Sequence, residues 1–225
     1  MREGVRRILK IIIGNKAYSS WSLRGWLAVK HSGLAFEEVV LPMYDAEWPV
    51  RRLAADLAPS GGKIPILWDG DVSAWNGLGI IDMLDQQTGG ALFWPTEPAA
   101  RAYAASISAE MQSSYQALRS ACSMNVRRHY PGWALGDEAA ADVARIDALW
   151  CRARGHYGAG GDFLFGGWGA ADMMFAPVAS RFTTYDVKLS PAAEAYRGAV
   201  MAHPHVVEWV EGAMREEWTL PQYEF

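Results

Sequence analysis

Residues 9–33 constrain the fold of this chain more than any other stretch. They open on an apolar run rich in β-branched residues, 8–13, which only Lys10 interrupts. Such a run is typical of a strand buried on both faces. A Gly-Asn pair ends it, apolar residues at helical spacing occupy positions 21–29, and Gly33 is placed to cap a helix end. We therefore expect a buried strand, a short loop and a helix.

Two hydroxyl residues, Ser19 and Ser20, stand immediately before this expected helix. The first turn of a helix carries free N–H groups and the positive end of the helix dipole, so an anion is expected beside the serines. Serine is also a favoured N-cap residue, and a purely structural role for both serines is the alternative.

The composition indicates a folded globular protein. The 225 residues are enough for two modest domains or one large one, with 51% hydrophobic and 20% charged residues. A net charge of -4 gives no indication of nucleic-acid binding. The 11 tryptophans are many, and because several flank Gly or Pro, we expect some of them to line a cleft.

The chain carries no sign of a membrane or secretory location. No apolar run reaches the length that a membrane span needs. The segment Met1–Gly4 leads directly into the first strand and predicts no signal peptide. Cys122 and Cys151 lie far apart and form no CxxC motif, so we expect a cytoplasmic protein with two reduced, structural thiols.

The first half of the chain alternates strands and helices. We expect a strand at 36–41, a helix at 48–57, a loop at 58–62, a hairpin of strands 64–68 and 72–75, and a helix at 76–87. The order β-α-β-α-β-β-α over residues 8–87 implies a parallel first pair of strands followed by antiparallel ones.

Beyond a Gly- and Pro-rich stretch the strand signals disappear. Helical patterns follow at 101–120, 138–157, 170–182, 191–201 and 205–217. We therefore expect an α/β domain at 1–88, a linker at 89–98, and an all-α domain at 99–225.

Four motifs in this order resemble those of the glutathione transferases: Ile13–Arg24 with YSSWSLR, the KIPIL segment 63–67, the segment 75–84, and Phe165–Tyr185. The first resembles the motif of serine-type enzymes, nearest the zeta class, which includes maleylacetoacetate isomerase. The resemblance covers nearly the whole chain, and it implies a thioredoxin-like N-terminal domain followed by a helical domain.

The resemblance also implies the site. Ser19 would donate a hydrogen bond to the thiolate of glutathione, with Ser20 as the second candidate. A cis bond between Ile64 and Pro65 would expose backbone groups to the cysteinyl part of glutathione. Lys63 is placed to meet a carboxylate, although a solvated loop lysine is the alternative.

The sequence departs from the family at two places. Asn76 and Gly77 replace the acidic residue and serine that take the γ-glutamyl end of glutathione in the family, which predicts weaker binding or a modified ligand. Gly169 replaces the Ser or Thr of a capping box whose other member is Asp172. We expect Asp172 to serve folding rather than catalysis.

Other residues have two interpretations. An electrophile pocket between the domains or simple core packing would explain Tyr18, Met111, Tyr115 and Met124. We expect a structural ion pair rather than a substrate contact for Arg24. At Arg127-Arg128 we expect a solvated pair, with a role in anion attraction as the alternative. His203-Pro204-His205 has no carboxylate or cysteine spaced near it, so no metal site is expected.

The leading functional hypothesis is a cytoplasmic, homodimeric transferase that activates the thiol of glutathione for attack on a small hydrophobic electrophile. A cis-trans isomerase of the maleylacetoacetate type is the nearest variant. The alternative of a different class is a non-catalytic member that serves as a binding or interaction module, which Asn76, Gly77 and Gly169 favour.

Overall fold

The computed structural model describes residues 8–225. Its sheet contains four strands in the spatial order β2-β1-β3-β4: β1 (Leu9–Gly14), β2 (Phe36–Leu41), β3 (Ile66–Asp69) and β4 (Val72–Trp75). β1 pairs with β2 in parallel, while β3 is antiparallel to both β1 and β4. The predicted parallel pair and hairpin are confirmed. The segment Met1–Gly4, on which the expected absence of a signal peptide rests, lies outside the described residues.

β1 is the central strand and is buried on both faces, as its apolar run predicts. Ile11 and Ile13 belong to the main hydrophobic core, whereas Ile12 packs on the opposite face with Leu57 and Ile66. All three isoleucines are fully buried.

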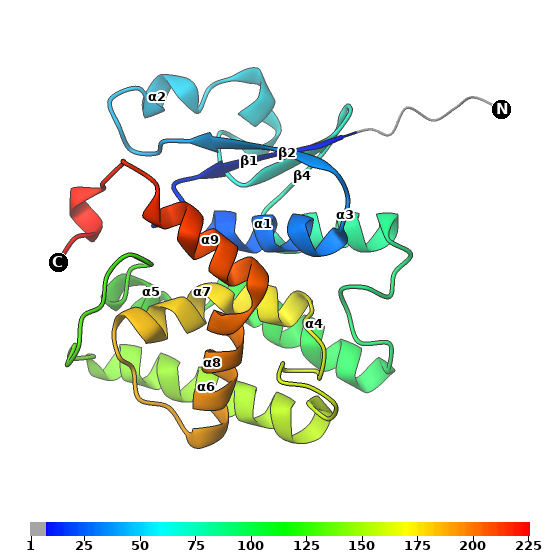
Figure 1. The fold of residues 1–225 in the computed structure, drawn as a ribbon, viewed down its shortest axis with the longest axis vertical. Coiled ribbons are helices and arrows are strands. Elements are labelled where there is room, and N and C mark those ends of the chain that lie inside the picture. The colour runs from blue at the N-terminus through cyan, green and yellow to red at the C-terminus, as the bar shows by residue number, and fades with distance from the viewer. Residues whose placement is uncertain (1–7) are drawn as a thin grey trace.

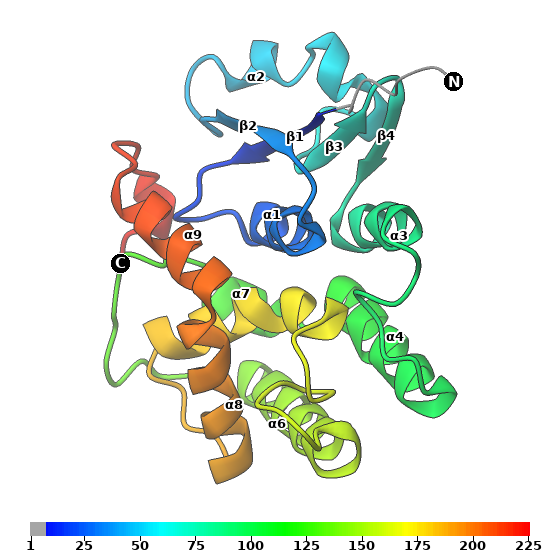
Figure 2. The same cartoon turned by 45° about the vertical axis from the view of Figure 1, so that its right-hand side comes forward.

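Helices cover both faces of this sheet (Figures 1 and 2). The helices α1 (Ser20–Ser32) and α3 (Gly77–Gln87) pack side by side on the face toward the helical half. The short helix α2 (Trp48–Arg51) and the 3₁₀ turn η1 (Ala55–Ser60) lie on the other face. α1 ends where predicted, because Gly33 adopts the left-handed conformation at φ 68° and its N–H donates to the Lys30 carbonyl.

The single helix expected at 48–57 is wrong, and part of the expected loop at 58–62 is helical. The structure has α2 and η1 instead, separated by a turn in which Ala54 is extended. This break lets Leu57 reach the core against Ile12 and Ile66, and Lys10 pairs with Asp56 at 3.1 Å. Packing against the sheet therefore outweighs the local helical pattern.

The second half is helical, as expected. Its elements are α4 (Pro98–Ser113), α5 (Gln116–Ala121), α6 (Asp137–Tyr157), α7 (Ala170–Thr184), α8 (Pro191–Ala202), α9 (Pro204–Met214) and the turn η2 (Pro221–Tyr223). Residues 88–97, between the two halves, contain no helix or strand. The one helix predicted at 101–120 is wrong: Tyr115 adopts φ 68° and separates α4 from α5.

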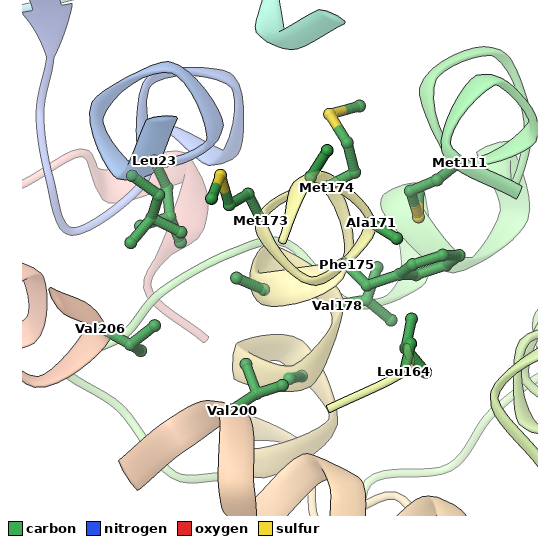
Figure 3. Packing of buried hydrophobic residues seen from close by; sticks show 14 of the residues in the cluster. Leu23, Met111, Leu164, Ala171, Met173, Met174, Phe175, Val178, Val200 and Val206 are labelled. Atoms are coloured by element: carbon green, nitrogen blue, oxygen red, sulfur yellow. The ribbon is translucent and has the colours of Figure 1, made fainter. Parts of the chain in front are cut away.

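α7 is the centre of the core and is buried along nearly its whole length. Figure 3 shows side chains from other elements arranged around it, among them Leu23 of α1, Met111 of α4 and Val200 of α8. α7 thereby joins the helical half to α1, whose N-terminal end carries the serines.

Asp172, in the first turn of α7, holds the preceding loop. Its carboxylate accepts hydrogen bonds from the N–H groups of Leu164 and Gly169 at 3.1 and 2.9 Å, and from the Tyr196 hydroxyl at 3.0 Å. Burial raises the pKa of Asp172 to about 6 in spite of these bonds. The predicted folding role of Asp172 agrees with this geometry, and the hydroxyl half of the capping box is missing because Gly169 has no side chain.

Within residues 8–225, none of the helices is long and apolar enough to cross a bilayer.

Candidate functional site

A cavity of about 720 Å³ opens beside the N-terminal end of α1 and is lined by both halves of the chain. Its walls include the predicted site residues Ser19, Ser20, Lys63, Ile64, Pro65 and Asn76. As expected, some tryptophans line it, namely Trp21, Trp48 and Trp75, although only Trp48 of these flanks a Gly or Pro. The structure therefore brings residues from three separate motifs to one site.

Ser19 is the N-cap of α1. Its hydroxyl oxygen accepts from the N–H of Ser22 at 3.3 Å, and the hydroxyl donates to the Ser22 Oγ at 2.8 Å. Ser22 is fully buried and also accepts from the Gly14 N–H at 2.9 Å. Ser19 therefore has the structural role of an N-cap. It also lines the cavity, with 7% of its surface exposed.

Ser20 lies inside the first turn of α1 and caps nothing. Its hydroxyl oxygen accepts from Nη2 of Arg181 at 3.4 Å, a long contact from the opposite wall. The hydroxyl proton has no acceptor among the described residues, so it is available to a bound group. Ser20 is 6% exposed, and like Ser19 it contributes to the cavity wall.

The peptide bond between Ile64 and Pro65 is cis, as the KIP motif predicted. Ser60 holds the loop that precedes it, since its hydroxyl donates to the Lys63 carbonyl at 2.5 Å and accepts from the Lys63 N–H at 3.1 Å. Lys63 makes no ion pair with any carboxylate of residues 8–225. Its ammonium group is therefore free to meet an anion.

Asn76 is the predicted N-cap of α3, and its Oδ1 accepts from the Gly79 N–H at 3.0 Å. Asn76, and not Gly77, has a positive φ, at 59°. Gly77 is buried behind the cavity wall, where an added Cβ would lie 2.9 Å from Met174 Sδ and 3.1 Å from Arg24 Cβ. Asn76 thus reaches the cavity, and Gly77 is absent from its lining.

The sequence reasoning missed two arginines of the helical half that line the cavity, Arg119 of α5 and Arg181 of α7. Arg181 is only 7% exposed, and it donates to the carbonyl of Cys122 as well as to Ser20. Burial, and then the charge of Arg119, lowers the pKa of Arg181 to about 10. The sequence does contain a signal for Arg181, because it is the single charged residue in segment 173–182, whose other residues are apolar or small.

The ion pair expected for Arg24 is wrong. Its Nε donates to the Met174 carbonyl at 2.8 Å, and its guanidinium lies 5.1 Å from the ring centre of Trp21. Its Nη1 has no hydrogen-bond partner in the part of the chain that the structure describes. Burial, and then the charges of Arg119 and Arg181, lowers its pKa well below the ordinary value. Arg24 therefore adds a third positive charge behind this wall.

The solvated pair expected at Arg127-Arg128 is also wrong. Arg128 pairs with Glu224 at 2.6 Å, and Arg127 donates to the carbonyls of Glu216 and Trp218, each at 2.9 Å. Both arginines therefore hold the C-terminal segment, which places Tyr223 on the cavity wall.

Of the residues suggested for an electrophile pocket, Tyr18 and Met124 line the cavity. Met111 and Tyr115 are buried away from it in the core, so the packing alternative holds for these two. In residues 8–225, no three His, Cys, Asp or Glu side chains gather as a metal site would require.

Residues 18–87 match the family model described as glutathione S-transferase, N-terminal domain. No curated protein sequence matches the chain. Solved structures do match in fold over nearly the whole length. A glutathione transferase homolog from Burkholderia gl BGR1, with bound glutathione, has a TM-score of 0.69 and 18% identity, and the match covers 93% of this chain and 100% of that one.

Two further structures give the same result. The tau-class glutathione S-transferase of mango, Mangifera indica, has a TM-score of 0.65 and 17% identity, with coverage of 92% and 95%. The theta-class enzyme of Xanthomonas axonopodis pv. citri, with glutathione bound, has a TM-score of 0.63 and 18% identity, with coverage of 91% and 97%. Residues 18–87 thus carry a glutathione S-transferase N-terminal domain, and the chain as a whole has the fold of the glutathione transferases.

Proposed function

We propose that the chain is a glutathione transferase that holds glutathione along the α/β wall of the cavity and activates its thiol beside Ser19 and Ser20. One observation carries the proposal: both serines line the same cavity as the cis Ile64-Pro65 bond. In addition, the three solved structures of similar fold are described as glutathione transferases, and two of them have glutathione bound.

Thiol activation would come from the serine pair and the end of α1. Each hydroxyl both donates and accepts, so the Ser19 proton can turn to a thiolate while Ser22 donates to Ser19 in its place. Lowering a thiol pKa by about two requires roughly 2.7 kcal/mol of preferential stabilisation of the thiolate. One charge-assisted hydrogen bond and a helix N-terminus supply about that amount. The guanidinium of Arg181, in contact with Ser20, adds to it.

The remaining parts of glutathione find matching groups. The backbone beside Pro65 suits the cysteinyl unit, and the free ammonium of Lys63 suits the glycine carboxylate. Because Oδ1 of Asn76 caps α3, its Nδ2 is left to donate to the γ-glutamyl carboxylate together with N–H groups at the start of the helix. Among residues 8–225, no Asp or Glu lines the cavity to meet the γ-glutamyl ammonium, so we expect weaker binding than a site with an acidic residue would give.

Calorimetric titration with glutathione, in parallel with γ-glutamyl-alanyl-glycine, tests the proposal. Both tripeptides should bind, and glutathione should bind more tightly and release protons near neutral pH, because only its thiol ionises. Absence of both heat and a thermal shift at millimolar glutathione would overturn the transferase and support the non-catalytic alternative, which Asn76 and Gly77 favour.

Transfer and cis-trans isomerisation share the activated thiolate, and the isomerase remains the second enzymatic candidate. We also propose that the protein is a homodimer and lies in the cytoplasm. Cys122 and Cys151 form no disulfide, which is in keeping with a reducing compartment. Sedimentation of the purified protein would test the dimer.

A further inference from the structure

The cavity is positively charged. Four basic residues line it, Arg52, Lys63, Arg119 and Arg181, and no Asp or Glu is found in its lining among residues 8–225. Arg52 and Lys63 belong to the α/β wall, where the proposed tripeptide lies. Arg119 and Arg181 stand on the helical wall, so the carboxylates of a glutathione molecule held along the α/β wall leave both arginines without a carboxylate partner.

Neither of these two arginines has a carboxylate partner in residues 8–225. The ion pairs of the structure include neither, and the acceptors of Arg181 are two backbone carbonyls and the Ser20 hydroxyl. A guanidinium has five N–H groups, so Arg181 keeps donors to spare. Within residues 8–225, the charge of Asp142 raises the pKa of Arg119, but Asp142 lies outside the cavity lining and accepts the Leu118 N–H.

Two neighbouring cations in a half-buried wall are costly to the fold. Burial lowers the pKa of both guanidinium groups, and the charge of Arg119 lowers that of Arg181 further. Hydrogen bonds to backbone carbonyls do not neutralise such a pair, whereas an anionic ligand would neutralise both charges. Arg119 does have a structural role, since its Nε donates to the Ser114 carbonyl at the end of α4. Arg181 likewise donates to the carbonyls of Arg119 and Cys122, but these hydrogen bonds leave its charge without an anion among residues 8–225.

An aromatic surface lies next to the pair. Trp21 is 37% exposed and lines the cavity, and the guanidinium of Arg119 is 5.4 Å from its ring centre. A planar, conjugated molecule with a carboxylate could contact this ring and place its charge on the arginines. The adjacent serines would then set the thiolate against its electrophilic carbon.

We propose that Arg119 and Arg181, with Trp21, form an anion subsite that selects a carboxylate-bearing, conjugated electrophile as the second substrate. This inference rests on the proposed function and replaces the expected small hydrophobic electrophile with an anionic one. In the probe reaction the thiol loses its proton to solvent and the thiolate sulfur bonds to an aryl carbon. The carbon–chlorine bond then breaks, and chloride leaves with the electron pair.

The test compares 4-chloro-3,5-dinitrobenzoate with its neutral amide, 4-chloro-3,5-dinitrobenzamide, each normalised to its uncatalysed reaction with glutathione. The carboxylate should have the higher normalised kcat/KM by about tenfold or more, the effect of one charge-assisted hydrogen bond. Arg119→Gln should lower the carboxylate value about ten- to a hundredfold and leave the amide value within about threefold. Arg181→Gln also removes the guanidinium beside Ser20, so it should lower both values, and the carboxylate value more than the amide value. Arg152→Gln, which removes an arginine outside the cavity, should change neither.

The comparison of the two electrophiles on the unaltered protein needs no variant, so misfolding of Arg181→Gln cannot obscure the result. Equal normalised values for carboxylate and amide would overturn the inference while leaving the transferase in place. The unreactive 3,5-dinitrobenzoate should also raise the melting temperature more than 3,5-dinitrobenzamide does, in the absence of glutathione. If glutathione gives no heat, the proposed function fails, and this thermal shift alone then decides whether the anion subsite exists.

Discussion

The phenol of Tyr18 donates a hydrogen bond of 2.6 Å to Glu224 across 206 positions of sequence. Glu224 also accepts from Asn125 at 3.0 Å and from Arg128 at 2.6 Å. The loop before α1 and the last residues of the chain are therefore joined at the edge of the cavity, and the ring of Tyr223 lies 5.7 Å from that of Tyr18.

Replacing this carboxylate should open the cavity wall. Glu224→Ala removes three hydrogen bonds, two of them from neutral donors and one from Arg128, so the segment 218–225 should exchange its amide hydrogens faster. Because Tyr223 lines the cavity, KM for the electrophile should rise, whereas a change in a terminal segment should shift global stability by less than about 1 kcal/mol. Hydrogen exchange measures the opening of segment 218–225, and steady-state kinetics measure KM for the electrophile. Glu217→Ala, an exposed acid of the same region, is the matched control.

The serines should separate into two phenotypes. Ser19→Ala removes both the cap of α1 and a thiolate donor, so it should lower stability by about 0.5–2 kcal/mol and raise the pKa of bound glutathione by about 1 to 2. Ser20→Ala removes no cap and should raise that pKa with stability nearly unchanged. Thermal melts and ultraviolet titration of the thiolate distinguish the two. A thiol pKa that neither variant changes would contradict a serine mechanism.

Gly77→Ser would restore the hydroxyl that the family resemblance implies, and the sequence alone predicts tighter glutathione binding. The structure leads to the opposite expectation, because the new Cβ would crowd Met174 and Arg24 behind the cavity wall. We expect a loss of about 1–3 kcal/mol in stability and no gain in affinity. At Gly79 a Cβ would find only an ordinary contact, 3.7 Å from Asn76 Oδ1, so Gly79→Ala should keep or raise the melting temperature. Calorimetric titration with glutathione and thermal melting of both variants measure the affinity and the stability.

Asp172 should give the protein a pH-dependent stability. Its folded-state pKa of about 6 exceeds the ordinary value of 3.8, so the folded state binds the proton more tightly than the unfolded chain does. The stabilisation is complete below about pH 4 and is lost as the pH rises through about 6, on the order of 2–3 kcal/mol in total. Asp172→Asn does not titrate, so its destabilisation relative to the parent should be larger near pH 4 than near pH 7. Urea unfolding across this range measures the difference, and a constant difference would contradict the raised pKa.

The sequence by itself determined the order of strands and helices and most of the cavity's α/β wall. The buried strand, the N-cap serines and the N-cap Asn76 are local patterns, which can be recognised from neighbouring residues in the sequence. Such patterns can be recognised in the sequence before the fold is known. The cis bond at Pro65 was expected instead from the resemblance of the KIP segment to the family motif. The positions of Ser19, Pro65 and Asn76 on one cavity followed from their shared place in a recognisable domain.

Only the tertiary structure decided the opposite wall. Arg181 comes from the middle of the most buried helix and Arg119 from a helix that Tyr115 starts with a left-handed backbone, and no local pattern relates either to Ser20. The position of Arg181 depends on α7 packing against α1, which brings its guanidinium to Ser20 across 161 positions of sequence. Hydrophobic packing is not directional, so the sequence predicts that α7 is buried but not which polar group it carries to the site.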